Sequence, residues 1–275
     1  MASAPRIAVV GSANIDFVAR CERLPRIGET VADASFERVP GGKGANQAVA
    51  AARLGARVRF VGRIGADDLV QRSLERNGID TSAVVRDEGE SGIALVVVEA
   101  SGENMIVVAP GANARLTPAD VDVGEVDAVM CQLEIPLAAV RAAAASAPFF
   151  CLNAAPAREG LDDDLEPDLL VVNRHEYEIV GPVGKLVALT LGADGAVLIE
   201  AGREVARAPS PRVRAIDTTA AGDAFCAALV VSLLEGRERT EALHRACAAG
   251  ALACSRFGAL LSLPTTSELE ELIGR

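Results

Sequence analysis

A short stretch near the C-terminus combines two carboxylates and two hydroxyls with residues that have almost no side chain. Residues 217–223 read Asp-Thr-Thr-Ala-Ala-Gly-Asp, and an apolar run with helical spacing, Ala224 to Leu234, follows at once. This order predicts a loop that opens a buried helix. Because Ala220, Ala221 and Gly222 leave their backbone N–H groups accessible, the loop and the positive end of the helix dipole form a candidate anion site.

Asp223 places a carboxylate at the edge of this candidate anion site. The rest of the sequence has to account for an acid that lies beside a site suited to negative charge. A purely structural interpretation stays open at this point: Asp217 or Thr219 caps a helix whose first turn happens to hold an acid.

A second glycine-rich stretch also runs directly into a helical pattern. Residues 41–47 read Gly-Gly-Lys-Gly-Ala-Asn-Gln, the helical segment covers 48–54, and Gly55 is the expected stop. Neither the spacing of the phosphate-binding loop nor that of the dinucleotide fingerprint matches it. Lys43 is one of only two lysines in a chain that otherwise uses arginine, so a compact point charge is a candidate requirement there.

Polar side chains recur where predicted strands end. They are Asn14, Asp16, Glu134, Asn153 and Asn173. Ligand residues of open α/β sheets gather at the carboxyl ends of strands, so the repetition favours one shared cleft. For Asn14 and Asp16 alone, a turn stabilised by the Asn or Asp side chain is the commoner explanation.

The arrangement of the predicted elements indicates one α/β domain over 1–275. Strand and helix patterns alternate along most of the chain, which is typical of a mainly parallel, Rossmann-like sheet covered by helices on both faces. Two segments, about 17–40 and 92–108, have β rather than helical character and predict a small separate sheet. We expect this sheet to act as a lid that excludes water from a transfer step.

The composition limits the possible partners and the compartment. The net charge of −11 argues against nucleic acid or an anionic membrane surface as a partner. Six scattered cysteines without metal-binding spacing fit reduced thiols. No apolar run approaches the ~20 residues of a membrane span, so we expect a cytoplasmic protein.

The two glycine-rich stretches together resemble the two signatures of the ribokinase-like (phosphofructokinase-B) sugar kinases. The motifs Asn14-Ile15-Asp16 and Gln132-Leu133-Glu134 make the resemblance strongest to the ribokinase branch, and it runs over nearly the whole chain. It implies a Rossmann-like sheet with a β lid and transfer of the γ-phosphate of ATP to the 5-hydroxyl of D-ribose.

The resemblance also implies roles for individual residues. Asp223 would be the general base, with a low pKa expected from its position at a helix N-terminus. The backbone of Ala220, Ala221 and Gly222 would neutralise the charge of the moving phosphoryl group. The residues that would hold ribose are Asn14, Asp16, Gly42, Lys43, Asn46 and Glu134, together with Asp223.

The same resemblance implies a nucleotide site and two ion sites. Asn173 and Glu176 match a pattern associated with ATP phosphates and Mg²⁺, which Glu176 would bind through water. The positions implied along the nucleotide are Thr190, Gly192, Gly195 and Gly222, with Cys247 near the adenine. The positions implied for K⁺, mostly through backbone carbonyls, are Asp217, Thr219, Ala253, Arg256, Gly258 and Ser262.

The chain departs from the family pattern at one crossover. Only 12 residues, Arg174 to Lys185, separate two predicted parallel strands, which is near the minimum for such a connection. We therefore expect a truncated helix on the nucleotide side and an altered presentation of Glu176. Alternatives remain: a kinase of another sugar or nucleoside, or a sugar-binding protein without catalysis. An exposed lid sheet would pair across a two-fold axis to give a homodimer.

Overall fold

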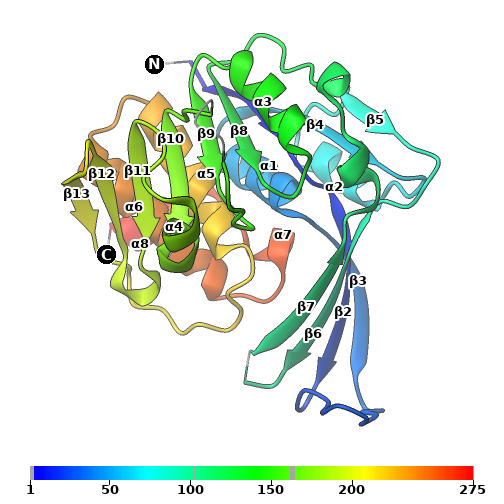
Figure 1. Cartoon of the computed structure of the whole chain (residues 1–275). Helices are drawn as coiled ribbons and strands as arrows, with labels where there is room; N and C mark the ends of the chain where they lie inside the picture. The colour runs from blue at the N-terminus through cyan, green and yellow to red at the C-terminus, as the bar shows by residue number, and fades with distance from the viewer. Residues whose placement is uncertain (1–2, 102, 162–164, 275) are drawn as a thin grey trace.

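Apolar runs rich in Val, Ile, Leu and Ala form the central sheet of the protein (Figure 1). The computed structural model describes residues 3–101, 103–161 and 165–274. Gly102, within the expected β segment 92–108, and both ends of the expected 1–275 domain lie outside these residues. Within them the sheet has nine strands in the order β13-β12-β11-β10-β9-β8-β1-β4-β5. The strand bounds are β1 Arg6–Val10, β4 Arg57–Ile64, β5 Val84–Arg86, β8 Ala128–Gln132, β9 Phe150–Asn153, β10 Leu169–Asn173, β11 Leu186–Thr190, β12 Ala196–Glu200 and β13 Arg203–Ala208.

The sheet is parallel from β5 to β11 and antiparallel at β12 and β13. Alternate residues of β1 enter different cores: Ile7 and Val9 pack on one face, Ala8 and Val10 on the other. A strand buried on both faces needs a continuous apolar run, and residues 7–10 supply one. The predicted mainly parallel α/β sheet is confirmed.

Helices cover both faces of this sheet (Figure 1). One face carries α1 Lys43–Arg53, α2 Leu69–Arg76, α5 Ala221–Leu234, α6 Arg239–Cys254 and α8 Thr266–Ile273. The other face carries α3 Leu137–Ala145, the short α4 Arg174–Val180 and the 3₁₀ turns Gly111–Arg115 and Pro118–Asp120. A third 3₁₀ turn, Gly192–Asp194, follows β11, and α7 Ala259–Ser262 lies near α1. None of the described helices is long and apolar enough to cross a membrane.

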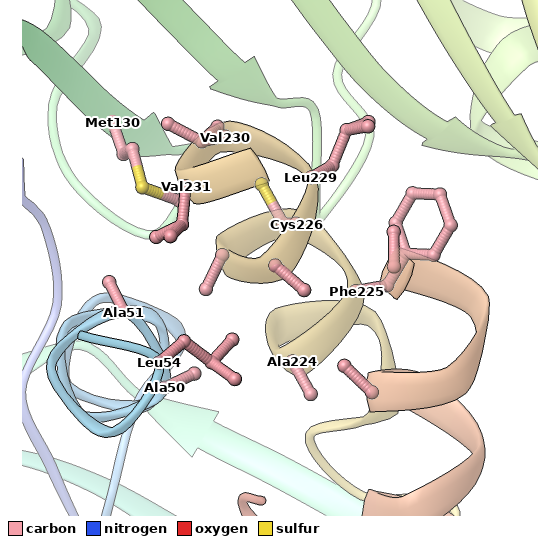
Figure 2. Close-up of a cluster of buried hydrophobic side chains, with 14 of the residues drawn as sticks. Ala50, Ala51, Leu54, Met130, Ala224, Phe225, Cys226, Leu229, Val230 and Val231 are labelled. Carbon is pink, nitrogen blue, oxygen red and sulfur yellow. The ribbon is translucent and has the colours of Figure 1, made fainter. Parts of the chain in front are cut away.

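Helix α5 packs closely against α1 (Figure 2). Small side chains at the contact, among them Ala50, Ala51 and Ala224, let the two backbones approach. Leu54 fills the remaining space at the end of α1 and is 5% exposed. Burying such a leucine contributes about 2 kcal/mol. The packing brings the first turns of both helices, and with them both glycine-rich motifs, to the same place.

Four further strands form a small sheet that projects from the body (Figure 1). They are β2 Asn14–Cys21, β3 Ser35–Gly41, β6 Gly92–Glu99 and β7 Asn104–Ala109, in the order β3-β2-β6-β7. The two predicted β segments therefore pair with each other; the first begins slightly earlier than expected, at Asn14, and the second begins at Gly92 as predicted. Asn14 and Asp16, expected at the end of the first strand, are instead the start of β2.

The short crossover holds a helix of seven residues, α4, between the parallel strands β10 and β11. This agrees with the expected truncation. Helix α4 begins with a complete capping box: the Asn173 side chain accepts from the Glu176 N–H at 2.8 Å, and the Glu176 carboxylate accepts from the Asn173 N–H at 2.7 Å. Such reciprocal capping stabilises a helix too short to persist alone.

Candidate active site

A cavity of about 750 Å³ lies between the small sheet and the carboxyl ends of the central strands. It collects most of the side chains that the sequence pointed to. Those that line it are Asn14, Asp16, Gly42, Lys43, Asn46, Glu134, Asn153, Asn173, Glu176, Thr190, Asp217, Thr219, Ala220, Gly222, Asp223 and Gly258. Residues from both glycine-rich motifs and from several strand ends therefore face one space, as the recurrence of polar strand ends indicated.

Some expected site residues lie outside this cavity lining. They are Ala221, Gly192, Gly195, Cys247, Ala253, Arg256 and Ser262. Cys247 is buried in α6, with its Sγ 3.8 Å from the Ala208 carbonyl oxygen. Arg256 instead forms an ion pair with Glu268 at 2.6 Å. The Ser262 hydroxyl donates to the Ala259 carbonyl at 2.9 Å.

Asp223 lies in the first turn of α5 and is 5% exposed. Its Oδ2 accepts a hydrogen bond from Asn46 Nδ2 at 2.9 Å, and its Oδ1 accepts one from Gln47 Nε2 at 3.0 Å. A carboxylate has about four acceptor sites, so acceptor capacity remains for a ligand hydroxyl.

The low pKa expected for Asp223 is wrong. Burial raises the pKa of this carboxyl above its ordinary value, and it outweighs the opposing effects of Lys43, Asn46 and Gln47. Loss of hydration disfavours the charged form of a buried acid more strongly than the helix N-terminus favours it here. The position of Asp223 at a helix N-terminus predicted a lowered pKa, but the burial of its carboxyl is not evident from the sequence.

The interpretation of Asp217 or Thr219 as a simple cap of α5 is also wrong. The N-cap residue is Ala220, without a side-chain hydrogen bond, and its backbone is left-handed at φ 61°. A non-glycine residue in this region is strained, and such strain gathers at functional sites. The turn places the start of α5 at the end of the cavity that Ala220 and Gly222 line, and the first N–H groups of a helix have no partner within it.

Asp16 and Asn14 line the side of the cavity next to the small sheet. Burial, and then the charge of Glu134, raise the pKa of Asp16 to about 7. Its Oδ1 is buried and has no hydrogen-bond partner among the described residues, and the same holds for Asn46 Oδ1. Two buried acceptors that lack donors fit a ligand with several hydroxyl groups.

Close approach of backbone and side chain explains glycines around these acceptors. A Cβ on Gly41 would lie 2.0 Å from Asp16 Oδ2, and one on Gly92 would lie 2.1 Å from Asn14 Oδ1. Gly42, at φ 91°, passes so near Asn14 that a Cβ would lie 2.8 Å from its backbone nitrogen. Only glycine leaves room for the polar side chains at these positions.

Lys43 lies among three carboxylates. Burial acts to lower its pKa, but Asp223, Glu134 and Glu176 together outweigh burial and raise it. The ammonium group is therefore charged and carries positive charge into an acidic site. The backbone N–H of Lys43 also donates to Glu134 Oε2 at 3.0 Å, and this bond connects α1 to the loop after β8.

Asn173, Glu176 and Thr190 line the other end of the cavity, where β10 and β11 end. The truncated crossover thus leaves Glu176 at the site, held by its capping bond to Asn173. Burial raises the pKa of Glu176, partly opposed by that bond and by Lys43. Within the described chain, no group of three or more His, Cys, Asp or Glu could hold a metal ion. A Mg²⁺ ion near Glu176 would therefore take most ligands from water and phosphate oxygens, as Mg²⁺ commonly does.

Asp217 joins two of the loops implied for K⁺. Its Oδ1 accepts from the Thr219 N–H at 2.9 Å, and its Oδ2 accepts from the Gly258 N–H at 3.0 Å. Despite burial, these bonds lower the pKa of Asp217. The structure thus brings Asp217, Thr219 and Gly258 together.

Sequence reasoning missed three polar residues at the site. Ser12 donates to Glu134 at 2.5 Å and accepts from the Gly44 N–H at 3.2 Å. Asn113 donates to Asn14 Oδ1 at 2.7 Å. Gln47 joins Asn153, one of the predicted polar strand ends, in the network around Asp223. Gln47 lies in a glycine-rich motif and could have been chosen, whereas nothing local distinguishes Ser12 or Asn113.

Comparison with known proteins agrees with this geometry. The model of the pfkB family carbohydrate kinases matches residues 4–266. The chain is 40% identical to the ribokinase of Bacillus subtilis, over 97% of this chain and 99% of that protein.

Two solved structures are similar over nearly their whole length. The ribokinase of Thermotoga maritima has a TM-score of 0.88 and 32% identity, covering 98% of this chain and 100% of that one. The ribokinase of Arabidopsis thaliana, solved with ribose and ATP, has a TM-score of 0.85 and 30% identity, covering 98% and 99%. The chain belongs to the pfkB family of carbohydrate kinases and is a phosphotransferase with an alcohol acceptor.

Proposed function

We propose that this protein is an ATP-dependent ribokinase that transfers the γ-phosphate to the 5-hydroxyl of D-ribose. The observation that carries the proposal is the buried Asp223 carboxylate beside the α5 N-terminus, in a cavity that also presents acceptors without donors. The relative from Arabidopsis thaliana, solved with ribose and ATP, supports the choice of both substrates.

In this proposal Asp223 accepts the proton of the 5-hydroxyl as the hydroxyl oxygen attacks the γ-phosphorus. The first-turn N–H groups of α5 and the Lys43 ammonium stabilise the charge of the transferring phosphoryl group. In a loose phosphoryl-transfer transition state, position and electrostatics matter more than the strength of the base. A raised pKa also suits Asp223, because a base is most effective when its pKa is not far below the operating pH.

The remaining residues divide between the two substrates. Asn14, Asp16, Gly42, Asn46 and Glu134 hold ribose. Asn173, Glu176 and Thr190 hold the phosphates and, through water, Mg²⁺, which supplies charge neutralisation when bound. Gly192, Gly195 and Cys247 lie further along the nucleotide. Because the Cys247 thiol packs against the Ala208 carbonyl, Cys247 contributes only to the wall of the adenine site.

We propose K⁺ as an activator held near the loops that Asp217 joins. The carbonyls of Ala253, Arg256, Gly258 and Ser262 would complete the site, and the ion would stabilise the loop that leads into the α5 N-terminus. Replacing K⁺ with Na⁺ should lower kcat, and equal rates in both salts would remove the ion from the proposal.

The small sheet is proposed as a lid of a single kinase domain. One of its faces lines the cavity with Val18, Ala94, Val96 and Ile106, so closure would cover the sugar and exclude water. Its opposite face exposes apolar side chains, which supports a homodimer formed through the lid sheets. The protein is expected to act in the cytoplasm, where ATP is available.

Coupled ADP release tests the proposal. Purified protein with Mg-ATP and K⁺ should give the highest kcat/KM with D-ribose among ribose, deoxyribose, fructose and adenosine. A higher kcat/KM for another acceptor would keep the kinase and change its substrate. Ribose binding by calorimetry without turnover would support a binding protein instead.

A further inference from the structure

Beneath the cavity, side chains from four elements form one hydrogen-bonded chain that ends on Asp223. Gln47 of α1 donates from Nε2 to Asp223 Oδ1 and to Asn153 Oδ1, each at 3.0 Å. Gln132, at the end of β8, donates from Nε2 to Gln47 Oε1 at 2.6 Å. Asn153, at the end of β9, donates from Nδ2 to the Val171 carbonyl at 3.1 Å.

The chain of bonds fixes which end of the Asn153 and Gln47 amides faces each neighbour. An amide can rotate by half a turn and exchange donor for acceptor, so its orientation follows from its partners. The Val171 carbonyl accepts only, which turns Asn153 Oδ1 towards Gln47. Gln132 occupies Gln47 Oε1 as a donor. The Gln47 NH₂ group therefore faces two acceptors, Asn153 and Asp223.

Neither glutamine belongs to the wall that the substrates touch. Gln47 and Gln132 are both 0% exposed and are absent from the cavity lining. Burying two primary amides is costly unless they are hydrogen-bonded. Gln132 even leaves its Oε1 without a partner among the described residues. A purely structural core would satisfy these positions with apolar side chains at lower cost.

We propose that Gln47 is a positioning residue for the catalytic base and that Gln132 locks Gln47 in the orientation that donates to Asp223. This inference rests on the proposed role of Asp223. The Gln47 bond holds one carboxylate oxygen in place, so that the remaining acceptor sites face the sugar hydroxyl. It also favours the ionised form, because a hydrogen bond to a charged acceptor is stronger than one to a neutral acceptor.

Several charged or titratable groups act on Asp223 besides Gln47. Lys43 from α1 favours its ionised form and Glu134 opposes it, while Asp223 itself raises the pKa of Glu176 and of Cys226. Removing the Gln47 donor leaves these groups in place. The pKa of Asp223 should then rise further, and the acid limb of the kcat–pH profile should move to higher pH.

The test compares wild-type enzyme with Gln47→Met, a substitution of similar length without polar hydrogens. We expect kcat at neutral pH to fall at least tenfold, KM for ribose to change less than threefold, and the acid limb to move up by about one to two pH units. The deficit should shrink as the pH rises. A uniform loss of kcat at every pH, with the limb unmoved, would overturn the proposal.

Gln132→Met provides a second test, in which neither Gln47 nor Asp223 is substituted. This test still applies if Gln47→Met does not fold. Without its lock, Gln47 can turn its oxygen towards Asp223, so the acid limb should move in the same direction by a smaller amount. In the double variant the shift should equal that of Gln47→Met, because both act through one bond. Full additivity, or no shift in Gln132→Met, would contradict the lock.

Asn113→Ala serves as the matched contrast, since Asn113 is 1% exposed and bonds to Asn14 rather than to Asp223. It should raise KM for ribose and leave the acid limb in place. Wild-type turnover is established first: an enzyme inactive on every acceptor overturns the proposed function. If the wild type is active and the acid limbs of the kcat–pH profiles of both glutamine variants are unmoved, only this inference is overturned.

Discussion

At the scale of single residues, the site places three carboxylates around one ammonium group. Lys43 is the cation that Asp223, Glu134 and Glu176 share. A carboxylate left alone in so buried a place would be protonated, and a lysine left alone would be neutral. The attraction of Lys43 opposes the effect of burial on Asp223 and Glu176, and the three carboxylates outweigh the effect of burial on Lys43 and keep its ammonium group charged.

Asp223→Asn tests the role of the Asp223 carboxylate. The amide keeps the shape of the side chain but cannot accept the proton, so kcat should fall by about 10²–10⁴-fold, the usual contribution of a positioned base. Steady-state ADP release measures it, and ribose binding by calorimetry serves as the control for an intact site. Near-normal turnover would remove Asp223 from the role of base.

Asp16 should make ribose affinity depend on pH. With a pKa of about 7, Asp16 is mostly protonated below that pH and ionised above it, and only the ionised form offers acceptors on both oxygens. The Kd for ribose without nucleotide should therefore be about tenfold higher at pH 6 than at pH 8. Calorimetric titrations at both pH values measure the ratio. Asp16→Asn should bind weakly with little pH dependence, and a flat wild-type profile would show that Asp16 does not govern binding.

At the scale of elements, the site depends on how α5 begins. The chain enters the helix through Ala220 in a left-handed conformation, where a Cβ is unfavourable. Glycine would relieve this, so the enzyme keeps a strained residue next to its candidate anion site.

Ala220→Gly should raise the free energy of unfolding by about 0.5–1 kcal/mol, because relief of strain exceeds the extra freedom of glycine in the unfolded chain. Urea titration measures it. Ala201→Gly is the matched control, with φ 48° in an exposed turn far along the chain from the site. Its gain should be similar and its kcat unchanged. A loss of stability in Ala220→Gly would show that the loop holds Ala220 without strain.

The sequence predicted the elements that carry strong periodicity and missed those that do not. Strand β13 reads Arg-Glu-Val-Ala-Arg-Ala, an edge strand whose charges disguise its alternation. Helix α4, whose truncation the short crossover predicted, has seven residues. The motifs located Asp223, Lys43 and Asn46, but the amide chain through Gln132 and Asn153 needs four elements to meet, and the raised pKa of Asp223 follows from burial. Both are consequences of tertiary packing.

At the scale of the whole molecule, the small sheet has two different apolar faces. One lines the cavity, and the register of the strands puts Phe36, Leu95, Met105 and Val107 together on the other. These four side chains are 53–64% exposed, with Val107 the most exposed at 64% and Leu95 the least at 53%. A contiguous exposed apolar surface of this kind is typical of an interface between subunits.

Leu95→Arg should therefore convert a dimer to a monomer, because the interface would have to bury an unpaired charge in each subunit. Light scattering coupled to size exclusion measures the mass at micromolar concentration. Val205→Arg is the control, since Val205 is 40% exposed on β13 of the main sheet. A monomeric wild type, or a Leu95→Arg protein that stays dimeric, would refute pairing through the small sheet.

The most direct test of the central claim is the identity of the product. Phosphorus-31 NMR of the reaction with D-ribose, Mg-ATP and K⁺ should show ADP and ribose 5-phosphate in equal amounts, and Asp223→Asn should yield neither above the blank without sugar. Phosphate on another hydroxyl would contradict the proposed position of the 5-hydroxyl against Asp223. ADP with free phosphate and no sugar phosphate would contradict the kinase itself.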